Sequence, residues 1–214
     1  SYQKTLKAEF GDIIKKEAGA DNSTPFTFTV NPVPALQSTT YTVIGTGQTS
    51  PLGLNIGTAT ESISESVPPN WQLTAASCTL QNGTPTGTRS GNSVNSITIQ
   101  SGQITTCTFT NGSLPQLQLV KNVINDNGGT ANASQWMLSA TGGAGSFSLP
   151  ATSVMSAGSF SSRASTGKQI MQSGVQYGLS ESGPSGYSMG TWTCSGTGYT
   201  LSSNTVTLAY GADA

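Results

Sequence analysis

The chain has 214 residues, only 8% of them charged, with a formal net charge of −1 and no histidine. This length fits two domains of about 100 residues, each large enough to bury a core. The near-neutral charge excludes a basic surface for nucleic acid, and the lack of histidine removes the commonest general base and metal ligand. No apolar run approaches the roughly 20 residues of a membrane-spanning helix.

Residues 1–20 differ from the rest because they hold four of the eight basic residues. Leu6, Ala8 and Phe10 alternate as in a strand, whereas the wider apolar pattern fits one face of a short helix that Gly11 would interrupt. Both interpretations stay open. The simpler expectation is an N-terminal extension or edge strand with a solvated basic tail.

Short alternating runs, typical of half-buried strands, follow at residues 26–30, 40–43, 62–65, 71–78, 96–99 and 105–110. Residues 111–115 have the composition of a linker. Comparable runs then recur at residues 117–121, 136–140, 146–149, 159–161, 176–181 and 206–208. Many short strands with regular turn signals predict two all-β sandwiches, one over residues 21–113 and one over 114–214.

One register relates the two halves over a long stretch without a gap. Four pairs of residues are each separated by 116 positions: Glu65 and Glu181, Pro68 and Pro184, Trp71 and Tyr187, Cys78 and Cys194. Such a register indicates an internal repeat. Beyond the cysteine the shift falls to 109, as Ile97 and Val206 show, because the following loop is shorter in the second copy.

The three cysteines are best explained by one structural disulfide and one cysteine whose partner is not in this sequence. Cys78 and Cys107 both lie in the first copy, and neither belongs to a zinc motif, so a disulfide between them and an oxidising compartment are expected. The partner of Cys194 would fall at position 216, beyond Ala214. In this chain the second sandwich is therefore expected to lack its last strand.

Two explanations for that missing strand remain. The chain is a segment of a longer repetitive protein, or another subunit donates the strand. In the second case residues 2–10 would be the donor, through Leu6, Ala8 and Phe10. Cys194 would then pair beyond Ala214 or stay unpaired.

The stretch Tyr177-x-Leu-x-Glu181-x-x-Pro184-x-Gly186-Tyr187, with Leu117-x-Leu-x-Lys121 upstream, resembles bacterial surface modules of the SpaA-like or Cna B-type prealbumin-like family. Trp-Thr-Cys at 192–194 and Thr-Cys-Thr-Phe-Thr-Asn at 106–111 are similar to its disulfide-bearing branch. The first copy departs from the pattern at Glu61, Asn70 and Trp71. The resemblance implies a Greek-key sandwich used as a stalk or fibre module.

Some members of that family carry a Lys–Asn isopeptide bond promoted by a buried acid. In the second copy Lys121 and Glu181 match the lysine and the acid, and the asparagine would lie beyond residue 214. In the first copy Glu65 and Asn111 match, and the lysine is ambiguous among Lys7, Lys15 and Lys16. The opposing interpretation is a surface lysine and a solvated or turn-capping glutamate.

Other chemistry has little support in the sequence. Glu65 and Glu181 occupy equivalent positions in separate domains and are not expected to face each other across one sugar. No catalytic residue, metal site or cofactor is expected. The chain is interpreted as a non-enzymatic, extracellular structural module of a bacterial surface fibre or adhesin stalk, assembling head to tail with itself or with further repeats. The alternative is a domain that binds carbohydrate, such as host or surface glycans, or protein.

Overall fold

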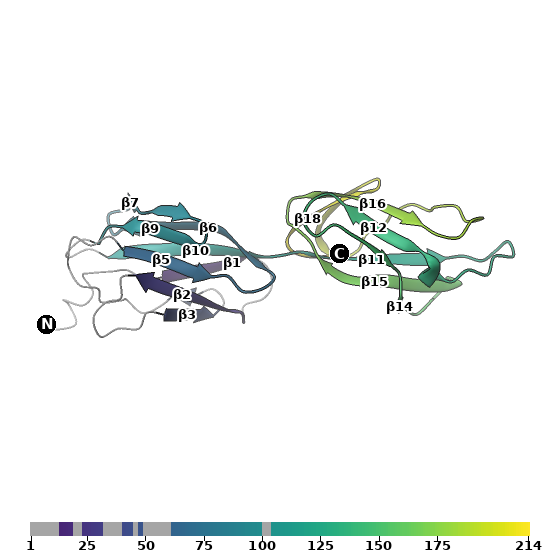
Figure 1. Cartoon of the computed structure of the whole chain (residues 1–214), viewed down its shortest axis with the longest axis horizontal. Coiled ribbons are helices and arrows are strands. Elements are labelled where there is room, and N and C mark those ends of the chain that lie inside the picture. The colour runs from purple at the N-terminus through teal and green to yellow at the C-terminus, as the bar shows by residue number, and fades with distance from the viewer. Residues whose placement is uncertain (1–12, 19–22, 32–39, 45–46, 49–60, 100–103) are drawn as a thin grey trace. The chain divides into compact units, whose positions relative to one another are not determined.

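The structure, a computed structural model, describes residues 13–18, 23–31, 40–44, 47–48, 61–99 and 104–214 (Figure 1). The chain divides into two compact units, residues 1–113 and 114–214. Strands form nearly all of the regular structure described in each unit, which confirms the all-β prediction. Among these residues no helix is long and apolar enough to span a membrane.

The described residues of unit 1 form two five-stranded sheets. Its strands are β1 (Ile13–Ala18), β2 (Pro25–Asn31), β3 (Thr40–Ile44), β4 (Gly47–Gln48), β5 (Glu61–Ser66), β6 (Trp71–Leu80), β7 (Pro85–Thr86), β8 (Thr88–Ser90), β9 (Ser93–Ile97) and β10 (Thr105–Ser113). The sheet orders are β4-β1-β10-β6-β7 and β3-β2-β5-β9-β8. Alternation directs every second side chain inward, and Phe26, Phe28, Ile63 and Phe109 fill the core with no exposed surface.

The structure corrects two expectations about the ends of this unit. Strand β1 pairs in parallel with β10 and antiparallel with β4, so it lies inside the sheet instead of at its edge. Its sequence, IIKKEA, lacks the clear alternation that would have located it. Asn111 is not in a linker, because β10 continues to Ser113 and β11 begins at Gln116. Residues Leu6, Ala8 and Phe10, the expected donor strand, lie outside the described residues.

Unit 2 contains β11 (Gln116–Val123), a short 3-10 helix (Ala133–Gln135), β12 (Met137–Thr141), β13 (Phe147–Pro150), β14 (Ser153–Val154), β15 (Ser162–Ile170), β16 (Gln176–Ser182), β17 (Thr197–Ser202) and β18 (Thr205–Asp213). The strand order is β13-β12-β16-β18-β11-β15-β14, with β17 paired to β18. Strand β18 joins the two halves of the sandwich, because its start pairs with β16 and its end meets β11 at Gln116.

Corresponding strands of the two units pair in the same way, so the repeat in the sequence is also a repeat of the fold. Strands β12 and β16 pair as β2 and β5 do, and β17 pairs with the start of β18 as β8 pairs with β9. One difference stands out. Residues 187–194, which the 116-residue shift aligns with β6, carry no strand in unit 2.

Candidate functional site

In unit 1 a buried acid and a buried amide meet between the two sheets. Glu65 lies on β5 beside Phe28, and Asn111 lies on β10 two residues after Phe109. Nδ2 of Asn111 donates a hydrogen bond of 2.7 Å to Oε1 of Glu65. Glu65 is 4% exposed and Asn111 is fully buried, and the rings of Phe28 and Phe109 pack edge to face beside them. The solvated or turn-capping interpretation of Glu65 is therefore wrong.

The register of β1 narrows the choice of lysine in unit 1. Lys15 pairs with Phe109 and Lys16 with Thr110, while Glu17 pairs with Asn111. The register therefore places the backbone of Lys15 level with Phe109, two residues before Asn111 on the neighbouring strand. Lys7 lies outside the described residues.

In unit 2 the equivalent acid holds a lysine. Nζ of Lys121 lies 2.7 Å and 2.9 Å from the two oxygens of Glu181, and both side chains are 11% exposed. The same ammonium group sits 4.7 Å from the centroid of the Trp136 ring, where a cation–π contact adds to the ion pair. An ion pair removed from water this far depends on both partners, because either charge alone would be costly to bury.

A third acid was not expected to be buried. Glu61 is 6% exposed, and its Oε2 is buried without a hydrogen-bond partner among the described residues. Burial raises the pKa of Glu61 above its ordinary value of 4.5. The signal was present in β5, where residues 61, 63 and 65 alternate inward. In unit 2 the same position holds Tyr177, which is fully buried and donates its hydroxyl to the carbonyl of Ala144.

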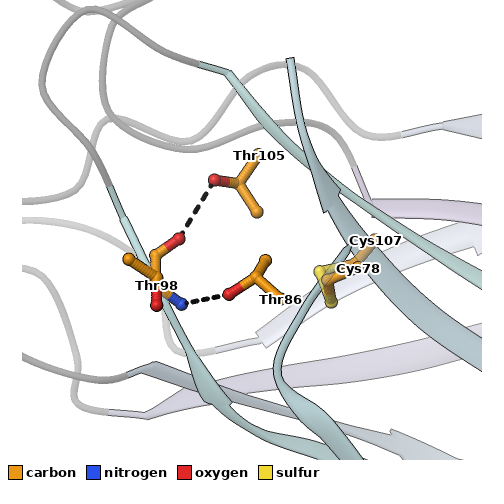
Figure 2. Close-up of a disulfide and its surroundings, with 5 residues drawn as sticks. All are labelled: Cys78, Thr86, Thr98, Thr105 and Cys107. Carbon is orange, nitrogen blue, oxygen red and sulfur yellow. Dashed lines mark hydrogen bonds between the residues drawn. A yellow bond between two sulfur atoms is a disulfide. The ribbon is translucent and has the colours of Figure 1, made fainter. Parts of the chain in front are cut away.

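Two of the three cysteines form a disulfide and the third is free, as the repeat predicts. Cys78 on β6 and Cys107 on β10 are joined by a disulfide across a register pair of the two strands (Figure 2). Beside it, Oγ1 of Thr105 donates to the carbonyl of Thr98, and N of Thr98 donates to Oγ1 of Thr86. Both bonds tie the loop after β9 to strands near the disulfide. Cys194 has no disulfide partner in the described structure and is half-buried.

The repeated turn after the acid is a packed corner. Trp71 packs edge to face on Phe26 in unit 1, and Tyr187 packs on Trp136 in unit 2, each pair with ring centroids 5.2 Å apart. The Tyr187 hydroxyl donates to Oδ1 of Asn125 at 2.7 Å and accepts from N of Ala131. These aromatic residues are committed to internal contacts and do not form an open sugar-stacking surface.

Within the described ranges, no cluster of three or more His, Cys, Asp or Glu side chains has the arrangement of a metal site. Two pairs of buried polar side chains, one of a lysine with an acid and one of an acid with an amide, instead lie at equivalent places in the two sandwiches. Such a set can polarise an amide and transfer a proton in a water-poor interior.

Comparisons with known proteins agree with this architecture. Residues 13–113 and residues 113–214 each match a family model described as a prealbumin-like fold domain of the SpaA type. A search of curated proteins gave no match.

Two crystal structures of the pilus adhesin SpaC from Lactobacillus rhamnosus GG are similar to the chain. The first, a C-terminal fragment, has 17% identity and a TM-score of 0.34, with 97% of each chain covered. The second has 20% identity and a TM-score of 0.31, covering 96% of this chain and 31% of the adhesin. The two domain matches together span residues 13–214, and the chain therefore belongs to the SpaA-like prealbumin-fold family, with one domain in each unit.

Proposed function

We propose that the chain is an extracellular structural module of a bacterial surface pilus or fibre, and that such modules assemble head to tail. The family match supports a pilus-associated role, and two repeated sandwiches fit a part that provides length. The observation that carries the proposal is the buried Glu65–Asn111 pair, since its hydrogen bond links the sheets of a domain whose strands β6 and β10 are already joined by a disulfide.

The proposed role includes an isopeptide bond in unit 1, between Lys15 and Asn111. Nζ of the unprotonated lysine attacks Cγ of Asn111, the Nζ–Cγ bond forms, the Cγ–Nδ2 bond breaks, and ammonia leaves. Glu65 already accepts a hydrogen bond from Nδ2, which suits it to relay the proton from the lysine to the departing ammonia. The surroundings of Glu65 and Asn111 are poor in water, and such surroundings favour the neutral lysine that the attack requires. Oδ1 of Asn111 is buried without a hydrogen-bond partner among the described residues.

In unit 2, Lys121 and Glu181 are proposed to serve the same reaction with an asparagine outside the sequence given. Their ion pair corresponds to the unreacted state, in which the acid holds the lysine in place.

Intact mass under denaturing conditions tests the bond in unit 1. We expect the full chain to be lighter than its sequence by one ammonia, after allowance for the two hydrogens lost to the disulfide. Lys15→Ala and Asn111→Ala should each restore the full mass, and the matched control Lys16→Ala should keep the deficit. A wild-type chain with no ammonia deficit would overturn the isopeptide proposal and leave the fold untouched.

Antibody labelling of intact cells tests the location and the role. Label spread along surface fibres is the expected result, and label only after lysis would contradict it. Label confined to fibre tips, together with binding on a glycan array, would favour the alternative of a carbohydrate- or protein-binding adhesin. The packed aromatic corners give that alternative no specific support.

A further inference from the structure

The chain contains three Asn-Gly pairs, at residues 82–83, 111–112 and 127–128. Such a pair can modify itself, because the backbone nitrogen of the glycine can reach the side-chain carbonyl carbon of the asparagine, and glycine has no side chain to hinder the approach. The reaction requires a backbone that can bend and a glycine N–H that is not already hydrogen-bonded. The surroundings of the three pairs therefore determine which of them is able to react.

The first pair is held at both of its reacting groups. N of Gly83 donates a hydrogen bond of 2.8 Å to the carbonyl of Leu80, and Oδ1 of Asn82 accepts one of 3.0 Å from N of Thr84. Both bonds belong to the tight turn that follows β6. Although Asn82 and Gly83 are exposed, ring closure between them has to break both bonds.

The second pair lies inside a sheet. Gly112 belongs to β10, where it pairs with Ala18 of β1 on one side and with Gln72 of β6 on the other. Asn111 is fully buried, and its amide donates to Glu65. An extended backbone between two neighbouring strands keeps the glycine nitrogen away from the asparagine side chain unless the strand leaves the sheet.

The third pair, Asn127-Gly128, has neither restraint. Both residues are exposed and lie in the loop between β11 and the short 3-10 helix. Within unit 2, every residue of which the structure describes, N of Gly128 donates no hydrogen bond. Nδ2 of Asn127 donates to Oδ1 of Asp126 at 3.2 Å, and this nitrogen is the group that leaves in the reaction. The attacking nitrogen is therefore free, and the Asn127 carbonyl carbon is open to solvent.

We propose that Asn127 is a site of spontaneous modification, where asparagine is converted into aspartate and isoaspartate. N of Gly128 attacks Cγ of Asn127, the N–Cγ bond forms, the Cγ–Nδ2 bond breaks, and the proton of the glycine nitrogen passes through water to the departing ammonia. Water then opens the cyclic imide at either of its two carbonyl carbons. The reaction consumes only water, and the proposal does not depend on a pilus role.

The modification acts on the corner that contains Tyr187. Oδ1 of Asn125 accepts a hydrogen bond from the Tyr187 hydroxyl, and N of Ala131 donates to the same oxygen, so the loop is fixed on both sides of Asn127. Isoaspartate carries the main chain through its side-chain carbon atoms and lengthens the loop between these two bonds. Either product also adds a negative charge beside Asp126, in a chain whose formal net charge is −1.

The test compares Asn127 with Asn82 in the same folded full-length chain, so that pH, buffer and temperature are identical. The chain is incubated at mildly alkaline pH, and the peptides that contain each site are analysed by mass spectrometry over time. We expect Asn127 to deamidate at least about tenfold faster than Asn82, because only Asn82 has to lose two hydrogen bonds before it reacts. In denaturant both bonds are absent, so the two rates should become similar.

Three results of this comparison would overturn the proposal. They are a rate at Asn127 no higher than at Asn82 in the folded chain, a rate difference that persists unchanged in denaturant, and an unreacted Asn127 in the folded chain over a period in which the denatured chain reacts.

A second measurement identifies the route. Opening of a cyclic imide gives isoaspartate as well as aspartate, whereas direct hydrolysis of the side-chain amide gives aspartate alone. Isoaspartate at residue 127 should accept a methyl group from protein isoaspartate methyltransferase, and the control variant Asn127→Gln should lose this labelled peptide. Aspartate without isoaspartate would overturn the proposal. Peptides from the two units are analysed separately, so this test and the isopeptide test at Asn111 fail independently.

Discussion

Trp136 and Gly183 pack against each other in unit 2, and the small size of the glycine makes room for the large indole ring. This size compensation can be tested by giving unit 2 the residues that unit 1 has at the same two positions. A Cβ atom on Gly183 would lie 2.4 Å from Nε1 and 2.5 Å from Cε2 of Trp136. Unit 1 has the smaller Phe26 in the place of Trp136 and the larger Val67 in the place of Gly183. Each unit therefore fills its corner with one large and one small residue.

Gly183→Val should destabilise unit 2, because the valine forces the indole ring out of its contacts with Tyr187 and Lys121. Overpacking of this kind costs about 1–3 kcal/mol, which corresponds to a fall in unfolding temperature of at least about 4 °C for a domain of roughly 100 residues. The double variant Trp136→Phe/Gly183→Val reproduces the unit 1 pair and should recover part of the loss, with a coupling of about 0.5–3 kcal/mol.

Hydrogen exchange followed by mass spectrometry is the suitable assay, because it reports the stability of each unit in the intact chain. Peptides from β12 and β16 should exchange faster in Gly183→Val, while peptides from β5 and β6 serve as the internal control. Two results would refute the packing argument. One is hydrogen exchange in unit 2 of Gly183→Val at the wild-type rate. The other is a loss of stability in the double variant as large as the losses of the two single variants added together.

Two further predictions concern unit 1. Replacing Cys78 and Cys107 together by serine removes a cross-link between residues that are 29 positions apart. The chain-entropy relation puts the loss in the free energy of unfolding at about 3–4 kcal/mol. Denaturant unfolding should show this loss in unit 1, and an equal loss in unit 2 would contradict the conclusion that the disulfide stabilises unit 1. Burial raises the pKa of Glu61 in the folded state, so its contribution favours folding near and below pH 4.5 and is lost as pH rises through the folded pKa. Glu61→Gln should flatten that pH dependence of unit 1 stability, and an unchanged pH profile of unfolding would show that the carboxyl group does not titrate differently in the two states.

Most of the architecture could be predicted because it depends on local patterns. The alternation of β2 and β5 and the shift of 116 between the two corners identified the strands, the repeat and the equivalence of Glu65 with Glu181. The same two cysteines that the sequence suggested are joined in the structure.

The errors lie where position depends on a distant partner. Strand β1 is positioned by parallel pairing with β10, about 90 residues away in the sequence. Its own sequence, IIKKEA, contains no pattern that predicts this pairing. Asn111 has the neighbours of a linker, Gly112 and Ser113, yet its side chain is held by Glu65 across the core. Glu61 is buried because it shares the inward face of β5 with Ile63 and Glu65, and the residue type of an acid does not predict that position.

The parallel pairing of β1 with β10 has a mechanical consequence. Ile13 begins β1 and Ser113 ends β10, so these two residues lie at opposite ends of the two paired strands. A force that pulls on them slides one strand along the other and loads the hydrogen bonds of all six register pairs at once, instead of opening them one at a time. The parallel direction of the two strands therefore determines how a pulling force is distributed over their hydrogen bonds. The free energy of unfolding without force does not report this distribution.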